Sequence, residues 1–166
     1  MGPRLPALTA VVVTAALAGC TNGSVASSSP GPDGCRSGAP EAGVWAPDRL
    51  QVRSPCALAE GVVVEVIREV DGDRHIWFRV DPGYEHLLNA DNHFQARPAM
   101  LAEITPDCPL DTNPPDGGTA ARCPPTSLSI PAIGDHISVR GPWALDKDHG
   151  WNEIHPVESI QIRHGG

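Results

Sequence analysis

The sequence predicts a mainly β domain of about five strands, on three observations. Between residues 56 and 163, hydrophobic and polar residues alternate at a spacing of two, which is the side-chain period of a β-strand. Glycine, proline and aspartate residues that favour turns separate these stretches. One short segment, residues 82–88, breaks the alternation with a helical pattern. A segment of this length suffices for one hydrophobic core but not for two.

The first two predicted strands form a hairpin. Residues 60–70, EGVVVEVIREV, form the first strand, and strict alternation places Val62, Val64 and Val66 on one of its faces. Asp71-Gly72 follows, a dipeptide that suits the positive φ angles of a two-residue turn. Residues 74–81, RHIWFRVD, are the return strand, and the side chains that share its apolar face are Ile76, Phe78 and Val80.

Three further strands and one short helix follow the hairpin. Pro82 suits a first helical turn, and Leu87-Leu88 can dock the short helix at 82–88 onto the sheet. The third and fourth strands are predicted at residues 99–105 and 134–146.

The fifth strand is predicted at residues 150–163. Its apolar face carries Ile154, Ile160 and Ile162. Pro156 has no N–H to donate, so we expect a sheet edge or a bulge at this point.

This set of elements fits a five-stranded Greek-key barrel of the oligonucleotide/oligosaccharide-binding (OB) type, and an open β-sandwich is the alternative. We expect the barrel at residues 56–163, followed by a short tail at 164–166. Residues 20–55 are predicted to be a flexible tether and an irregular arm, because the segment after Cys20 is rich in serine, glycine and proline.

The N-terminus is typical of an exported protein. Residues 1–19 contain one positive charge, Arg4, followed by an uncharged apolar run that ends in small residues, which is the pattern of a signal peptide. The sequence Leu17-Ala18-Gly19-Cys20 resembles the lipobox of bacterial lipoproteins, in which the cysteine is diacylated and becomes the mature N-terminus. The resemblance implies anchoring at Cys20 to the outer face of the cell membrane, because several acyl chains bind a bilayer firmly.

The number of cysteines agrees with export. Lipidation of Cys20 leaves four of the five cysteines, an even number, in an oxidising compartment. Three pairings are possible on paper, and the spacing favours Cys108 with Cys123 and Cys35 with Cys56. A zinc site is the alternative, although no Cys-x-x-Cys pair is present.

The charge of the chain disfavours nucleic acid as a partner. Removal of residues 1–19 takes away Arg4 and no acidic residue, which changes the formal net charge from −8 to −9. Binding to a phosphate backbone requires clustered lysine and arginine side chains. This chain has a single lysine, Lys147, and its arginines are scattered.

Two stretches, DGDRHIWFRVDPGYEHLLN and VRGPWALDKDHGWNEIHPVESI, resemble a family of uncharacterised bacterial extracytoplasmic proteins. The resemblance covers about residues 60–162 and implies an OB-like barrel, with no assigned activity. The motif positions that this sequence shares are Asp71, Gly72, Asp73, His75, Asp81, Tyr84, Glu103, Asp146, His149, Trp151, Glu153 and His155.

Polar side chains on two strands form the candidate ligand site. His75 lies with Trp77 and Arg79 on the face opposite the apolar one, and Trp151, Glu153 and His155 do the same on the last strand. If the two strands are close, these side chains share a surface, with Asp146 or His149 from the adjoining turn. Imidazole and carboxylate groups are suitable ligands for a divalent metal such as zinc.

Three interpretations of this cluster remain open: a structural hydrogen-bond network, a metal or ligand site, and a catalytic site.

Other known functional motifs are incomplete or absent in this sequence. The segment starting at Asp146 resembles a calcium loop, but it has Trp151 at the sixth position, where glycine is required, and Val157 at the twelfth, where glutamate is required. The sequence contains no His-Glu-x-x-His motif and no Gly-x-Ser-x-Gly motif.

The sequence therefore predicts a membrane-anchored surface lipoprotein with a β-barrel module that binds or scaffolds. An envelope glycan or a protein is the expected partner, because OB barrels bind oligosaccharides and the chain is acidic. The alternative is a hydrolase that depends on a divalent metal bound by His149, Glu153 and His155, with His75 as a further candidate.

Overall fold

The computed structural model describes residues 1–2, 34–69, 71–107 and 126–165. Most of the predicted signal peptide, Cys20, and the predicted bond between Cys108 and Cys123 lie outside these ranges. Within the described ranges, no helix has the length and apolar character needed to cross a membrane.

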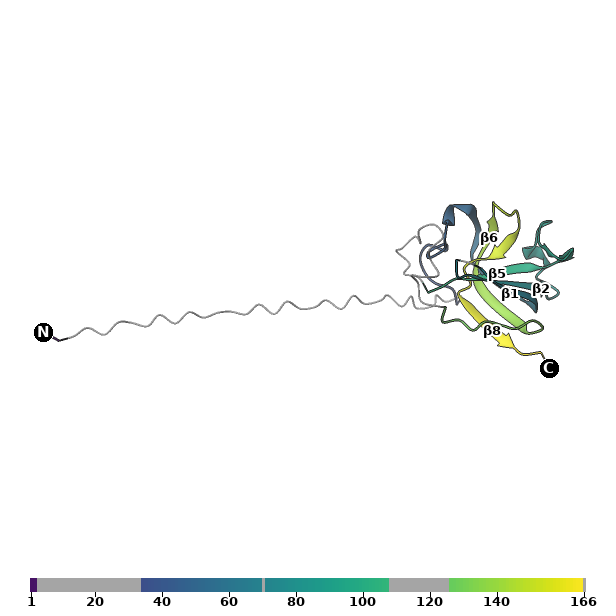
Figure 1. Ribbon diagram of the computed structural model, residues 1–166. Helices are drawn as coiled ribbons and strands as arrows, with labels where there is room; N and C mark the ends of the chain where they lie inside the picture. Colours follow the sequence, from purple (N-terminus) through teal and green to yellow (C-terminus); the bar gives the residue numbers. More distant parts are fainter. Residues whose placement is uncertain (3–33, 70, 108–125, 166) are drawn as a thin grey trace.

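The described chain is mainly β (Figure 1). Six strands form one sheet in the order β1-β2-β5-β7-β6-β8. Their bounds are Leu50–Arg68 for β1, Arg74–Val80 for β2, Met100–Ile104 for β5, His136–Asp146 for β6, Asn152–Ile154 for β7 and Ser159–Arg163 for β8. Two strands of two residues each, β3 (His93–Phe94) and β4 (Arg97–Pro98), form a separate small sheet. Two short 3-10 helices, η1 (Pro47–Arg49) and η2 (Glu85–Leu87), complete the elements.

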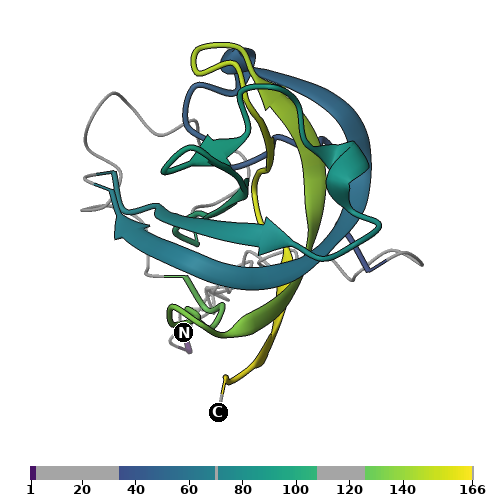
Figure 2. The ribbon, with the colours of Figure 1, turned by 90° about the vertical axis from the view of Figure 1, so that its right-hand side faces the viewer.

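The strand pairings form a circuit that starts and ends at β1. β1 pairs with β2, β2 with β5, β5 with β7, β7 with β6, and β6 again with β1. All of these pairs are antiparallel except β5 with β7, which is parallel. Figure 2 shows β1 and β6 as long, strongly curved ribbons around the domain. β1 can pair on both edges at Gly61, where a Cβ would lie 2.0 Å from the backbone oxygen of Arg79 on β2.

The predicted hairpin is confirmed, but the predicted face of its first strand is wrong. β1 and β2 pair antiparallel, and Gly72 in the turn has a φ of 104°. The pairing shifts between Val63 and Glu65, which is a β-bulge that changes the side-chain phase. Val63 is therefore buried in the core with Val66 packed against it, whereas Val62 is exposed.

The last predicted strand is two strands. Residues 150–163 contain β7 and β8, which both pair with β6 and are separated by a segment that contains Pro156. The proline cannot continue the ladder of hydrogen bonds, so the chain leaves the sheet and returns to it. The predicted apolar face is nevertheless confirmed, because Ile154 lies in the core and Ile160 and Ile162 pack against it.

The third and fourth strands and the short helix lie where they were expected, as β5, β6 and η2. Trp143 of β6 donates a hydrogen bond from Nε1 to the backbone oxygen of Leu87, at a distance of 3.0 Å, and so ties η2 to the sheet. The main core is apolar and includes Ile76, Phe78 and Met100 at its centre.

The arm before Cys56 packs against the domain. The predicted disulfide between Cys35 and Cys56 is confirmed. The backbone N–H of Arg36 donates to Glu158 Oε2 at 2.6 Å, and its side chain donates to Glu158 Oε1 at 2.9 Å. β1 also begins at Leu50, before the expected domain boundary. The disulfide and the ion pair thus hold the segment that leads into η1 and β1.

Candidate functional site

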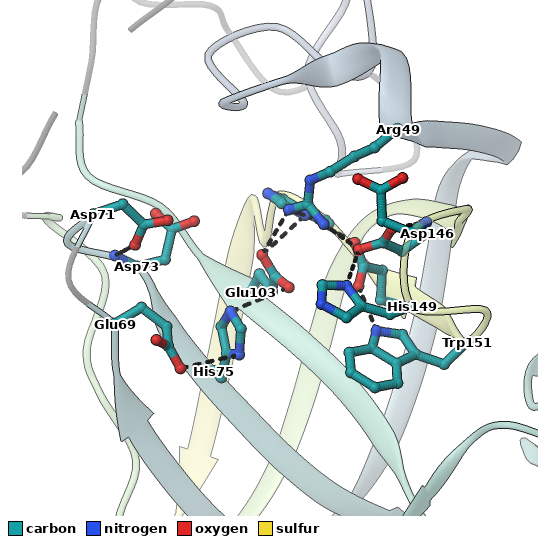
Figure 3. A network of polar contacts seen from close by, with 12 residues as sticks. Arg49, Glu69, Asp71, Asp73, His75, Glu103, Asp146, His149 and Trp151 are labelled. Carbon is teal, nitrogen blue, oxygen red and sulfur yellow. Dashed lines mark hydrogen bonds and ion pairs between the residues drawn. The ribbon is translucent and has the colours of Figure 1, made fainter. Parts of the chain in front are cut away.

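A group of mostly charged side chains from four stretches of the chain converges near one end of the sheet (Figure 3). We call it the polar cluster. Glu103 lies near its centre, with Asp73 and His75 on one side and Asp146, His149 and Trp151 on the other. The members of the polar cluster are Arg49, Asp73, His75, Glu103, Asp146, His149, Trp151, Glu153 and His155.

Strand alternation places the cluster on the face opposite the main core. On β5, Met100, Ala102 and Ile104 belong to the core, so Leu101 and Glu103 point the other way. The register pairs His75 of β2 with Glu103, and β7 runs beside β5. An aromatic group packed on the same face, made by Trp77, Phe94 and Trp151, borders the polar cluster.

A chain of contacts runs through the buried part of the cluster. His155 Nδ1 lies 2.9 Å from Glu153 Oε1 and 3.0 Å from Glu103 Oε2. Glu103 Oε1 lies 3.3 Å from His75 Nε2, and His75 Nδ1 lies 3.6 Å from Glu69 Oε1. Glu103, Glu153 and His155 are each at most 2% exposed, so the network is removed from bulk water.

Arg49, at the end of η1, joins the two halves of the cluster. Its Nη1 donates to Asp146 Oδ2, and its Nη2 lies 3.5 Å from both Glu103 Oε2 and His155 Nδ1. Leu50 pairs with Asp146 in the β1–β6 ladder, which places the preceding Arg49 beside that carboxylate. Sequence reasoning missed Arg49 because the arm before Cys56 was expected to be irregular.

The turn after β6 adds a stacked pair of rings. His149 Nδ1 lies 2.7 Å from Asp146 Oδ2, and its ring stacks on Trp151 with the centroids 4.5 Å apart. Trp151 donates from Nε1 to Glu153 Oε2 at 3.0 Å and meets Trp77 edge to face. The side chain of His149 is 50% exposed, so this pair forms the accessible border of the cluster.

Burial and charge together shift the pKa values in the cluster. Burial alone raises the pKa of Glu103, but His155 and His75 outweigh it and hold the pKa well below its usual range. Burial lowers the pKa of His155, whereas Glu103 and Glu153 raise it by a larger amount. For Asp73, burial outweighs the attraction of His155 and raises the pKa to about 7. Asp73 is therefore the carboxyl group that this environment makes hard to ionise.

Two buried nitrogen atoms in the cluster, Arg49 Nε and His155 Nε2, have no hydrogen-bond partner among the residues that the structure describes. Buried polar atoms are satisfied in the great majority of cases, so an orphaned atom requires an explanation. In addition, Asp73, Glu103 and His155 each place one ligand atom within 4.8 Å of the other two, and all three residues are buried. These three residues could hold a metal ion.

The structure brings the predicted site residues together, in a changed arrangement. His75 and His155 meet at Glu103, and Glu153 contacts His155, whereas Asp146 and His149 are linked to them through Arg49. The metal ligands expected from sequence included His149 and Glu153, but those side chains are engaged with Asp146, Trp151 and His155. Asp73, a motif position of the resemblance, contributes from the β1–β2 turn. The ligand role of the cluster stays a prediction.

Comparison of the chain with protein-family models, with curated proteins and with solved structures finds no match.

Replacement of Arg49 by alanine is expected to destabilise the domain by about 3–5 kcal/mol, because it leaves buried carboxylates without their arginine. The free energy of unfolding in urea measures this loss. Arg68→Ala, at an exposed position of β1, is the matched control and should change that free energy by about 0.5 kcal/mol or less. Equal effects of the two changes would show that the imidazoles alone balance the carboxylates.

The stability of the domain is expected to fall in acid partly through Asp146. Burial alone raises the pKa of this carboxyl group, but hydrogen bonds from His149 and the N–H of Asp148, with the charge of Arg49, lower it below its usual value. A depressed pKa contributes stability above the unfolded-state pKa of about 3.9, and this contribution is lost as the pH falls through the folded-state pKa. Asp146→Asn should therefore destabilise the protein at pH 7, and the two proteins should become closer in stability as the pH falls below about 3.9, the unfolded-state pKa. Thermal unfolding measures the stability of both proteins. If the difference in stability between them stays constant from pH 7 to pH 2, this assignment is wrong.

Proposed function

We propose that the protein is a surface lipoprotein, anchored through Cys20, whose domain is an OB-like barrel that binds a ligand at the polar cluster. The circuit of pairings from β1 through β2, β5, β7 and β6 back to β1, with β5 parallel to β7, supports the barrel. The disulfide between Cys35 and Cys56 supports an oxidising compartment outside the cytoplasm.

The position of the polar cluster in this barrel carries the binding role. A five-stranded OB barrel binds its ligands on the face of its second and third strands. The site lies between the loop that joins strands one and two and the loop that joins strands four and five. In this chain those strands are β2 and β5, which contribute His75 and Glu103. The flanking loops are the β1–β2 turn with Asp73 and the β6–β7 turn with His149. The cluster therefore occupies the place where such barrels bind.

The burial of the central groups favours binding over hydrolysis. A hydrolytic site needs an open coordination position that a substrate can reach. Glu153 and His155, two of the three expected metal ligands of the hydrolase alternative, are 0% and 1% exposed, whereas the third, His149, has a side chain that is 50% exposed. The accessible part is the border made by His149 and Trp151, where a ligand can contact an aromatic surface without reaching the buried carboxylates.

An envelope glycan is the proposed partner at this border. Pyranose rings present apolar C–H faces that pack on aromatic rings, and hydroxyl groups can bond to the exposed imidazole of His149. The formal net charge of the chain, −8 with residues 1–19 included, disfavours nucleic acid. The absence of glycan binding in the second experiment below would reject the glycan as the partner.

Anchoring is tested by Cys20→Ser in the full chain, expressed in a bacterium. The unchanged chain should sediment with membranes and extract into detergent, because acyl chains hold it there. The variant should move to the soluble extracytoplasmic fraction or stay uncleaved, and its N-terminal peptide should lack the mass of the lipid. If the N-terminal peptide of the unchanged chain also lacks the mass of the lipid, lipidation at Cys20 is refuted.

Glycan binding is tested by co-sedimentation of the full chain with purified cell-wall polysaccharide. His149→Ala should weaken binding by about fivefold to tenfold, the loss expected for one aromatic contact. His86→Ala, which removes an exposed histidine on η2, is the matched control and should bind as the unchanged chain does. Equal binding by all three proteins would remove the border from the proposed site.

A further inference from the structure

The buried centre of the polar cluster has the composition of a metal site. Asp73, Glu103 and His155 offer two carboxylates and one imidazole, with one ligand atom of each within 4.8 Å of the others. A group of acidic residues alone would carry little weight, since such groups are common without an ion. Here the third member is a histidine that is 1% exposed and whose ring nitrogen Nε2 has no partner in the described part of the chain.

The surroundings of His155 select the nitrogen that a metal would use. Nδ1 lies 2.9 Å from Glu153 Oε1, and a carboxylate partner requires that this nitrogen carry the hydrogen. Metal binding would displace the proton of His155 from Nε2, which no described residue contacts by a hydrogen bond. Trp151 in turn donates to the other oxygen of Glu153 and fixes that carboxylate. A carboxylate that orients a histidine in this way is typical of metal ligands.

Asp73 supplies the second independent feature. Asp73 is 7% exposed as a residue, and within the described ranges no residue gives its carboxyl group a hydrogen bond or an ion pair. An unpaired carboxylate is costly to bury. A cation between Asp73, Glu103 and His155 would satisfy both Asp73 and the orphaned nitrogen.

We propose that Asp73, Glu103 and His155 bind one divalent metal ion of the zinc class, in a buried site that orders the ligand-binding face. This inference rests on the proposed function, because it names what occupies the centre of that face. The mixed set of one nitrogen and two oxygens suits zinc, and water would complete a tetrahedral coordination. Calcium prefers six to eight oxygen ligands, which this group does not offer.

The charge around the site supports a cation. The polar cluster contains the carboxyl groups of Asp73, Glu103, Asp146 and Glu153 and one permanently charged cation, Arg49. Arg49 lies on the side of Asp146, with Nη1 donating to that residue. A dication near Asp73 would neutralise the opposite side of the cluster.

The test is a zinc titration of the full chain, purified in detergent after treatment with a chelator. Calorimetry should show one zinc ion bound per chain, and zinc should raise the melting temperature, whereas magnesium and calcium should leave it unchanged. Asp73→Asn is the diagnostic variant. It should weaken zinc binding by more than about 100-fold, beyond the usual effect of losing an outer-shell partner.

Asp71→Asn is the matched control, because it removes the same charge from the same turn. Asp71 Oδ1 accepts a hydrogen bond from the Asp73 N–H at 3.1 Å, and an asparagine oxygen can accept the same bond. This variant should bind zinc within about threefold of the unchanged chain, since it loses only a neighbouring charge. Melting curves in chelator establish that both variants fold.

The outcomes separate this inference from the proposed function. No zinc binding by the unchanged chain, or equal losses in Asp73→Asn and Asp71→Asn, would overturn the metal site. Either result would leave membrane anchoring and glycan binding to be judged by their own experiments. Conversely, zinc binding with the expected variant pattern, in a chain that fails those experiments, would retain the metal site and reject the surface-binding role.

Discussion

Four carboxyl groups are buried in one small region of this protein, and the negative charge of those that ionise has to be balanced for the domain to fold. Asp73, Glu103, Asp146 and Glu153 are each at most 7% exposed. Isolated buried charges are costly, whereas charges with partners are tolerated. Arg49 and the imidazoles of His75 and His155 provide that balance, and the arrangement of the site follows from their positions.

This requirement gives the N-terminal arm a structural role. Arg49 reaches the carboxylates because the chain before β1 is held against the domain at two points, the Cys35–Cys56 disulfide and the contacts of Arg36 with Glu158. β1 then continues from Leu50, which pairs with Asp146, and so extends the sheet up to the cluster. The arm thus contributes the arginine as well as part of the sheet.

The same strands serve two faces with different chemistry. On β2 and β5, one set of alternate side chains builds the apolar core and the other builds the aromatic group and the polar cluster. The main core supplies the hydrophobic stabilisation. The opposite face can therefore hold charged groups even though their burial lowers the free energy of unfolding. Such a division is common in proteins that place a binding site on a stable scaffold.

Much of the fold was predictable from sequence, because its rules are local. The alternation of apolar residues predicted the hairpin, β5, β6 and the core face that contains Ile76 and Ile154, since side chains along a strand point to alternate sides. The prediction failed where a local rule was interrupted. A bulge after Val63 reversed the phase of β1, and the segment at Pro156 divided the last strand into β7 and β8.

The sequence by itself determined which residue types were present and, outside the bulged β1, which face of the sheet they occupied, including His75, Glu153 and His155. Only the tertiary structure decided that His75 and His155 meet at Glu103, with Glu153 beside His155, because that contact depends on the parallel pairing of β5 with β7, which joins segments far apart in the chain. It also decided that Arg49 and Asp73 belong to the site. Neither residue lies in a regular alternating strand, so no periodic pattern could indicate where its side chain would point.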